Sequence, residues 1–135
     1  MKHKYSAYQN LETILITTES LTYFGGSIDY TNLYGSPKEL RSGNCAELER
    51  INCEGGWGIS NDAALGNLTT LIVSSGCTAL SFIDCQGNQL SASALNDLFN
   101  SLPTTEDGEI QTFGNPGNST CDNSIAKKKG WYFYP

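Results

Sequence analysis

One stretch constrains the fold of this chain more than any other. It runs from Cys77 to Leu90 and reads CTALSFIDCQGNQL, so that its apolar residues and its asparagine follow the frame LxxLxCxxNxL. The alternation inside this frame predicts a short strand with every second side chain buried. Asn88 is placed to turn the chain by hydrogen-bonding backbone groups. Most of the frame recurs in Cys45–Gly56, and a recurring unit of this kind predicts stacked parallel strands.

Two further stretches fit the frame less closely. Tyr8–Leu21 is interpreted as an earlier, degraded repeat, and Glu109–Phe113 is predicted to be a fourth strand with Asn115 in the position of Asn88. Positions 19, 56, 88 and 115 would then be four equivalent corners, spaced 37, 32 and 27 residues apart. This uneven spacing predicts large insertions on one side of the fold.

In the C-terminal third, the spacing of the apolar residues changes from that of a strand to that of a helix. Apolar residues between Leu95 and Leu102 recur at helical spacing, which predicts a helix that Ser91 or Ser93 caps and that ends before Pro103. A second short helix is predicted at 122–129, ended by a glycine at position 130. The alternating segment Trp131–Tyr134 is predicted to be a strand that covers the last open edge.

Three segments allow more than one interpretation. We expect Leu21–Asn44 to be an irregular connection, with a short hairpin or a helical turn after Pro37. Asn61–Asn67 is interpreted as a single helical turn. Leu68–Val73 is interpreted as the outer segment of a repeat, with an ordinary β-strand as the alternative.

Composition and charge limit the classes of partner that this chain can have. At 135 residues the chain suits a single domain, and its net charge of −6 argues against a nucleic acid or an anionic membrane as partner. No run of about 18 apolar residues is present, so membrane insertion is not expected. Basic residues near Met1 are not followed by an apolar segment, so this chain is interpreted as carrying no signal peptide.

The five cysteines are interpreted as structural. Their odd number argues against a complete disulfide framework, and Cys45 to Cys53 and Cys77 to Cys85 are each eight residues apart, which is poor zinc-ligand spacing. We expect small buried side chains stacked between successive repeats and no metal site. A disulfide between Cys53 and Cys85 is the less favoured alternative.

The frame resembles the cysteine-containing leucine-rich repeats of bacteria, known from gut anaerobes. The resemblance is specific over residues 67–135, fair over 45–56 and faint over 1–44. The matching C-terminal segments are Leu90–Pro103, Gly114–Gly117, Cys121–Ala126 and Lys129–Trp131.

This resemblance implies an α/β fold: a short, irregular leucine-rich-repeat solenoid with about four parallel strands on one concave sheet and helices and loops on the convex side. It implies one domain over 1–135, with an irregular N-terminal repeat and insertion (1–44), core repeats (45–90) and a C-terminal repeat and cap (91–135). It also implies export or attachment to the cell surface, with a cytoplasmic location as the alternative if Met1 is the native start.

The expected function is binding without catalysis. Residues that alternate with the buried positions would face outward and are the candidate ligand-binding residues. They are Arg50, Asn52, Glu54, Phe82, Asp84, Gln86, Glu109, Gln111 and Phe113. The same reasoning places Thr13, Leu15 and Thr17 on this face. Phe82 and Phe113 are candidate aromatic anchors, and the alternative is that the N-terminal insertion or Trp131 and Tyr132 cover both.

A protein or a glycan is the expected partner, bound by a monomer that needs no cofactor. Two other functions are kept open: the structural, capped end of a longer surface protein, and an acidic intracellular immunity-type antagonist of a basic enzyme. Catalysis is not expected, because the single histidine, His3, is near a terminus and the acidic residues Glu106, Asp107 and Glu109 cluster in a turn.

Overall fold

The computed structural model describes residues 13–17, 22–25, 37–55 and 66–133. Eight strands and two helices occur in these ranges. They are β1 (Thr13–Ile16), β2 (Tyr23–Gly25), β3 (Glu39–Ser42), β4 (Arg50–Asn52), β5 (Thr70–Ile72), β6 (Phe82–Asp84), α2 (Ala92–Ser101), β7 (Gly108–Gln111), α3 (Ser124–Lys127) and β8 (Trp131–Phe133).

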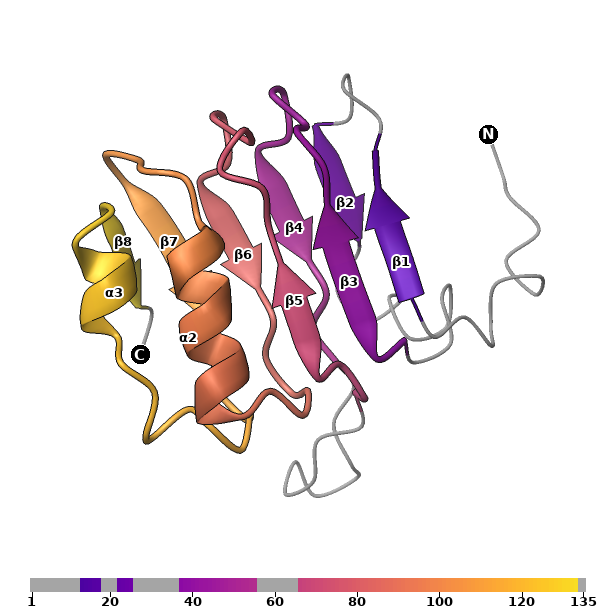
Figure 1. Ribbon diagram of the computed structural model, residues 1–135, viewed down its shortest axis with the longest axis vertical. Coiled ribbons are helices and arrows are strands. Elements are labelled where there is room, and N and C mark those ends of the chain that lie inside the picture. Colours follow the sequence, from indigo (N-terminus) through magenta and orange to yellow (C-terminus); the bar gives the residue numbers. More distant parts are fainter. Residues whose placement is uncertain (1–12, 18–21, 26–36, 56–65, 134–135) are drawn as a thin grey trace.

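The strands form two parallel sheets, and the fold is α/β. The order is β1-β3-β5 in the three-stranded sheet and β2-β4-β6-β7-β8 in the five-stranded sheet. Along the chain, each strand of the first sheet is followed by one of the second, and α2 and α3 precede β7 and β8 in the same way. Figure 1 shows the result as two layers, with α2 beside β5 and α3 beside β8.

The core lies between the two layers. Most strands alternate between buried and more exposed positions, and the buried isoleucines of neighbouring strands are in register: Ile51 with Ile83, and Ile83 with Ile110. Leu40 and Leu71 are the buried counterparts in the three-stranded sheet. Because the chain passes between the layers after every strand, the same short frame is used repeatedly and each repeat buries its apolar residues against the next.

Two asparagines hold equivalent corners of the chain. The Asn88 side-chain amide donates to the carbonyls of Cys53 (2.9 Å) and Cys85 (3.2 Å), and its oxygen accepts from the Leu68 N–H (3.2 Å). Asn115 repeats this pattern one strand later: its amide donates to the carbonyls of Cys85 and Thr112, and its oxygen accepts from the Leu90 N–H. The predicted equivalence of these two corners is confirmed, whereas positions 19 and 56 lie outside the described residues.

The helix predicted from the apolar spacing is confirmed as α2. Ser91 is its N-cap and accepts from the Ala94 N–H, and Leu95, Leu98 and Phe99 form its buried face. At the other end of the helix, the Lys129 ammonium donates to the carbonyls of Asn100 (2.6 Å) and Leu102 (2.9 Å). A cation at this end complements the helix dipole.

The C-terminal segment closes the five-stranded sheet as predicted. Helix α3 is four residues long, shorter than expected, and Gly130 follows with a φ of 91°, a conformation that favours glycine. Strand β8 then pairs with β7, and the buried Trp131 donates its indole N–H to the Pro103 carbonyl at 2.9 Å.

The N-terminal third differs from the prediction. Residues after Pro37 form strand β3 and not a hairpin or a helical turn, and the connection predicted at 21–44 contains a further strand, β2.

Leu68–Val73 contains β5, which agrees with the alternative of an ordinary strand. The single helical turn predicted at 61–67 falls mostly outside the described residues.

The prediction of about four strands on one sheet is therefore not confirmed. Strand β1 belongs to the three-stranded sheet and pairs with β3, so Thr13, Leu15 and Thr17 do not join the face of β4, β6 and β7. The strand that pairs with β4 is β2. The sequence of β1 alternates as a strand of either sheet would, and alternation alone does not distinguish the two layers.

Candidate functional site

The outward-pointing residues of the five-stranded sheet form one continuous face. We call this the outer face and define it by the nine candidate residues of β4, β6, β7 and the positions just after them, together with Tyr23 of β2 and Tyr132 of β8. Inward-pointing residues on the same strands, such as Ile83 and Ile110, are fully buried. The parallel register brings the candidate residues of the three central strands side by side.

The first row of the outer face crosses all five strands. Its members in order are Tyr23, Arg50, Phe82, Glu109 and Tyr132. Aromatic and charged side chains alternate along this row. Neighbouring strands lie about 4.8 Å apart, so each side chain reaches its neighbours in the row.

Side chains of the first row contact one another in pairs. The guanidinium carbon of Arg50 lies 4.1 Å from the centre of the Phe82 ring, a cation–π geometry. The Tyr132 hydroxyl donates to Glu109 Oε1 at 3.1 Å. This hydrogen bond is the main reason that the pKa of Tyr132 is raised, with smaller contributions from desolvation and from the charges of Glu109 and Asp107.

A hydrogen-bonded chain links the first row to the second. The second row contains Asn52, Asp84 and Gln111. The Gln86 amide donates to Asp84 Oδ1 at 3.0 Å and to Gln111 Oε1 at 2.7 Å, and the Gln111 amide donates to Glu109 Oε2. These bonds fix the side chains of four candidate residues from two strands before any partner binds.

Asp84 is the most buried polar residue of the outer face, with 5% of its surface exposed. Its Oδ1 accepts from both the backbone N–H (3.1 Å) and the side-chain amide of Gln86. Asn52 makes the corresponding local bond, in which its Oδ1 accepts from the Glu54 N–H at 3.2 Å. Each polar side chain at the strand end thus also stabilises the turn that follows it.

The two phenylalanines proposed as anchors lie in different rows. Phe82 is opposite Glu109, so Phe113 lies four residues, roughly 13 Å, further along the strand direction. Phe113 is 62% exposed, whereas Phe82 is partly buried and lies under Arg50. They therefore do not form one aromatic patch, and Phe113 is not covered by Trp131 or Tyr132.

Tyr23 and Tyr132 belong to the outer face but are not among the nine predicted candidates, and Tyr23 was not singled out from the sequence at all. Strand β2 contains only three residues and lacks the leucines of the repeat frame. A usable signal was the spacing between buried positions: Phe24 and Ile51 are 27 residues apart, as are Ile83 and Ile110.

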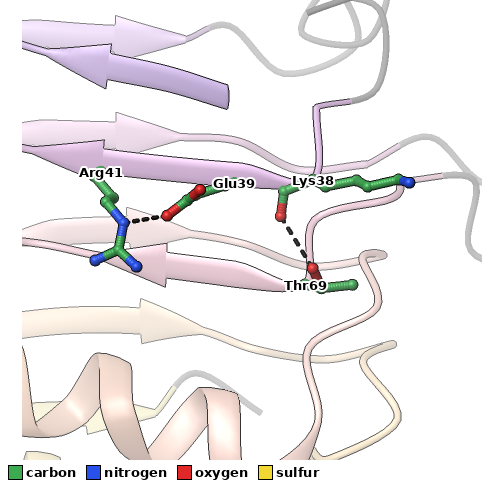
Figure 2. A network of polar contacts seen from close by, with 4 residues as sticks. All are labelled: Lys38, Glu39, Arg41 and Thr69. Carbon is green, nitrogen blue, oxygen red and sulfur yellow. Dashed lines mark hydrogen bonds and ion pairs between the residues drawn. The ribbon is translucent and has the colours of Figure 1, made fainter. Parts of the chain in front are cut away.

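The exposed side of the three-stranded sheet has a different character. Figure 2 shows an ion pair between Arg41 and Glu39, and the Thr69 hydroxyl donating to the Lys38 carbonyl at 3.2 Å. Leu15, next to Arg41 in the register, is 62% exposed. In the described part of this side, Arg41 and Glu39 form one local ion pair. On the outer face, by contrast, hydrogen bonds link side chains within and between rows.

The five cysteines are free thiols, and four of them are buried next to the strands of the two sheets. Cys45, Cys53, Cys77 and Cys85 are fully buried, which confirms the predicted burial. The Cys85 thiol donates to the Gln111 carbonyl at 3.4 Å, and that of Cys77 to the Gly43 carbonyl at 3.3 Å. Desolvation, with the charge of Asp84 as a further cause, raises the pKa of the Cys53 and Cys85 thiols, which keeps them protonated and unreactive.

The described residues contain neither a cluster of metal ligands nor a membrane-spanning helix. Within the described ranges, no three or more histidine, cysteine or acidic side chains come together in a way that would hold a metal ion. None of the helices described here has the length and apolar character that crossing a membrane requires.

The chain was compared with models of protein families, with curated proteins and with solved structures, and none of the three comparisons found a match.

Proposed function

We propose that this protein is a non-enzymatic binding module that recognises a protein or a glycan through its outer face. The observation that carries the proposal is the register of the outer face, which aligns charged, aromatic and amide side chains across neighbouring strands. Ready-made rows of this kind lower the entropic cost of ordering side chains on binding. Exposed aromatic residues supply the contact area that recognition sites favour.

We further propose that the fold is a short leucine-rich-repeat solenoid of the bacterial type. Three observations support this: the passage of the chain between two layers after every strand, the matching roles of Asn88 and Asn115, and the stacked cysteine positions. A cell-surface location is proposed on the resemblance alone. The outer face would then correspond to the recognition surface of the repeats.

The experiment that tests the function compares a variant of the outer face with a control variant of the other sheet. Phe113→Ala/Tyr132→Ala removes two exposed aromatic side chains of the outer face, while Leu15→Ala removes an apolar side chain with the same exposure as Phe113 from the other sheet. All three proteins are screened against arrays of immobilised glycans and of surface proteins, after circular dichroism has shown equal folding. We expect a ligand that the wild type and Leu15→Ala bind and that the outer-face variant loses.

Two outcomes would contradict the proposal. If every ligand that binds the wild type is retained by the outer-face variant, this face is not the recognition surface. If Leu15→Ala loses the ligand to the same extent, recognition belongs to the other sheet or to general surface hydrophobicity.

A further inference from the structure

Charge is distributed unevenly over the described residues. The outer face contains three carboxylates, Glu54, Asp84 and Glu109, but a single described cation, Arg50. Two more exposed acids, Glu106 and Asp107, precede β7.

The other described cations belong to other parts of the fold. Lys38 and Arg41 are on the side of the three-stranded sheet, and the remaining three lysines are in and just after α3. The outer face is therefore acidic in a chain whose net charge is already −6. The negative charge of the outer face favours a positively charged partner.

The hydrogen bonds of the outer face add an independent argument. Both hydrogens of the Gln86 side-chain amide point to acceptors within the face, and the Gln111 amide and the Tyr132 hydroxyl donate to Glu109. These donors are thus used internally. A carboxylate can accept about four hydrogen bonds, so Glu109, with two of these bonds, keeps acceptor capacity for a partner.

The aromatic side chains suit the same kind of partner. Tyr23 and Tyr132 are at the two ends of the first row and both are exposed. The contact between Arg50 and Phe82 shows that a guanidinium group fits over an aromatic ring at the row's centre. Further cations from a partner can bind over the tyrosine rings in the same way while pairing with the neighbouring carboxylates.

Building on the proposed function, we propose that the partner is a protein segment rich in arginine or lysine, held against the outer face by its carboxylates and tyrosines. Nucleic acids are repelled by this charge. An uncharged glycan would form no ion pair with these carboxylates, and glycan binding is therefore the competing outcome of the test.

The test uses a fluorescently labelled octa-arginine peptide as the probe, with fluorescence anisotropy as the readout. Two variants have the same net charge of −4, because each removes two carboxylates from a chain of charge −6. Glu54→Gln/Glu109→Gln changes the outer face. Glu47→Gln/Asp97→Asn, the matched control, changes exposed acids on a corner turn and on α2.

We expect the wild type and the control to bind octa-arginine with similar affinity and the outer-face variant to bind at least about tenfold more weakly. Raising the salt concentration from about 0.05 M to about 0.5 M should weaken wild-type binding strongly, since the interaction depends on charge. Circular dichroism and urea unfolding of each variant establish that the fold is unchanged.

Three results would overturn the inference: no binding of octa-arginine, equal losses in the two variants, or a face-dependent ligand that is an uncharged glycan. These failures are distinguishable from failure of the proposed function. If octa-arginine does not bind but the array ligand is still lost in Phe113→Ala/Tyr132→Ala, the outer face remains the binding site and only the cationic nature of the partner is refuted.

Discussion

Replacing Asn88 by alanine is the sharpest test of how this fold is held together. Its side chain is 1% exposed and contacts four backbone groups: three carbonyls, those of Cys53, Cys85 and Gln86, and the Leu68 N–H. Alanine leaves the Cys53 carbonyl and the Leu68 N–H without this partner, whereas the Cys85 carbonyl still accepts from Asn115 and the Gln86 carbonyl from the Gly55 N–H. Each buried polar group that loses its partner costs about 1–3 kcal/mol.

The expected cost of Asn88→Ala is about 2–6 kcal/mol, because two buried groups, the Cys53 carbonyl and the Leu68 N–H, each lose a partner at about 1–3 kcal/mol. This is a large part of the roughly 5–15 kcal/mol that stabilises a typical domain. The assay is urea unfolding followed by circular dichroism, in which the midpoint should fall while the slope stays constant.

Two matched variants sharpen the interpretation of this result. Asn100→Ala removes an exposed asparagine side chain from α2 and should change the free energy of unfolding by less than about 0.5 kcal/mol. Asn88→Asp keeps the acceptor for Leu68 but loses the donors, so it should be at least as destabilising as the alanine variant. The reasoning is refuted if Asn88→Ala is within about 1 kcal/mol of Asn100→Ala.

Two further predictions concern the thiols and the tyrosine of the outer face. In the native protein only the partly exposed Cys121 should react with a thiol reagent at pH 8, and all five cysteines should react in denaturant; reaction of Cys85 in the native state would contradict the burial argument. Glu109→Gln should lower the pKa of Tyr132 toward the ordinary tyrosine value in an NMR or ultraviolet titration, and an unchanged pKa would exclude the hydrogen bond as the cause. Because the folded pKa of Tyr132 is raised, its stabilising contribution is present below the ordinary tyrosine pKa and is lost as pH rises through the folded pKa.

The repeat frame predicts the part of the fold where its residues recur. Strands β4, β6 and β7 follow the expected frame, and α2 follows from helical spacing with a serine cap. The frame does not predict that residues 23–25 form strand β2, and it does not predict to which sheet β1 belongs. Both strands are short, and an alternating segment has the same pattern in either layer, so the layer is decided by packing with strands distant in the sequence.

The sequence predicts which residues lie on the outer face, but it does not predict which of their side chains contact one another. Alternation places Arg50, Phe82 and Glu109 on one face, and the parallel register then puts them in one row. The hydrogen bond between Gln86 and Gln111 depends on the lengths of the two side chains and on the exact register of their strands. The sequence pattern specifies neither. Phe82 and Phe113 belong to neighbouring strands, as predicted, but lie four residues apart along the strand direction, which alternation alone does not specify.

Asp84 connects the chemistry of the outer face with the core beneath it. Burial is the main cause of the raised pKa of the Cys53 and Cys85 thiols, but the negative charge of Asp84 contributes to both. A cation bound at the outer face would offset that charge and so reduce this contribution, while desolvation would still keep both thiols protonated. Burial and the charge of Asp84 act in the same direction, so both keep the Cys53 and Cys85 thiols protonated and unreactive.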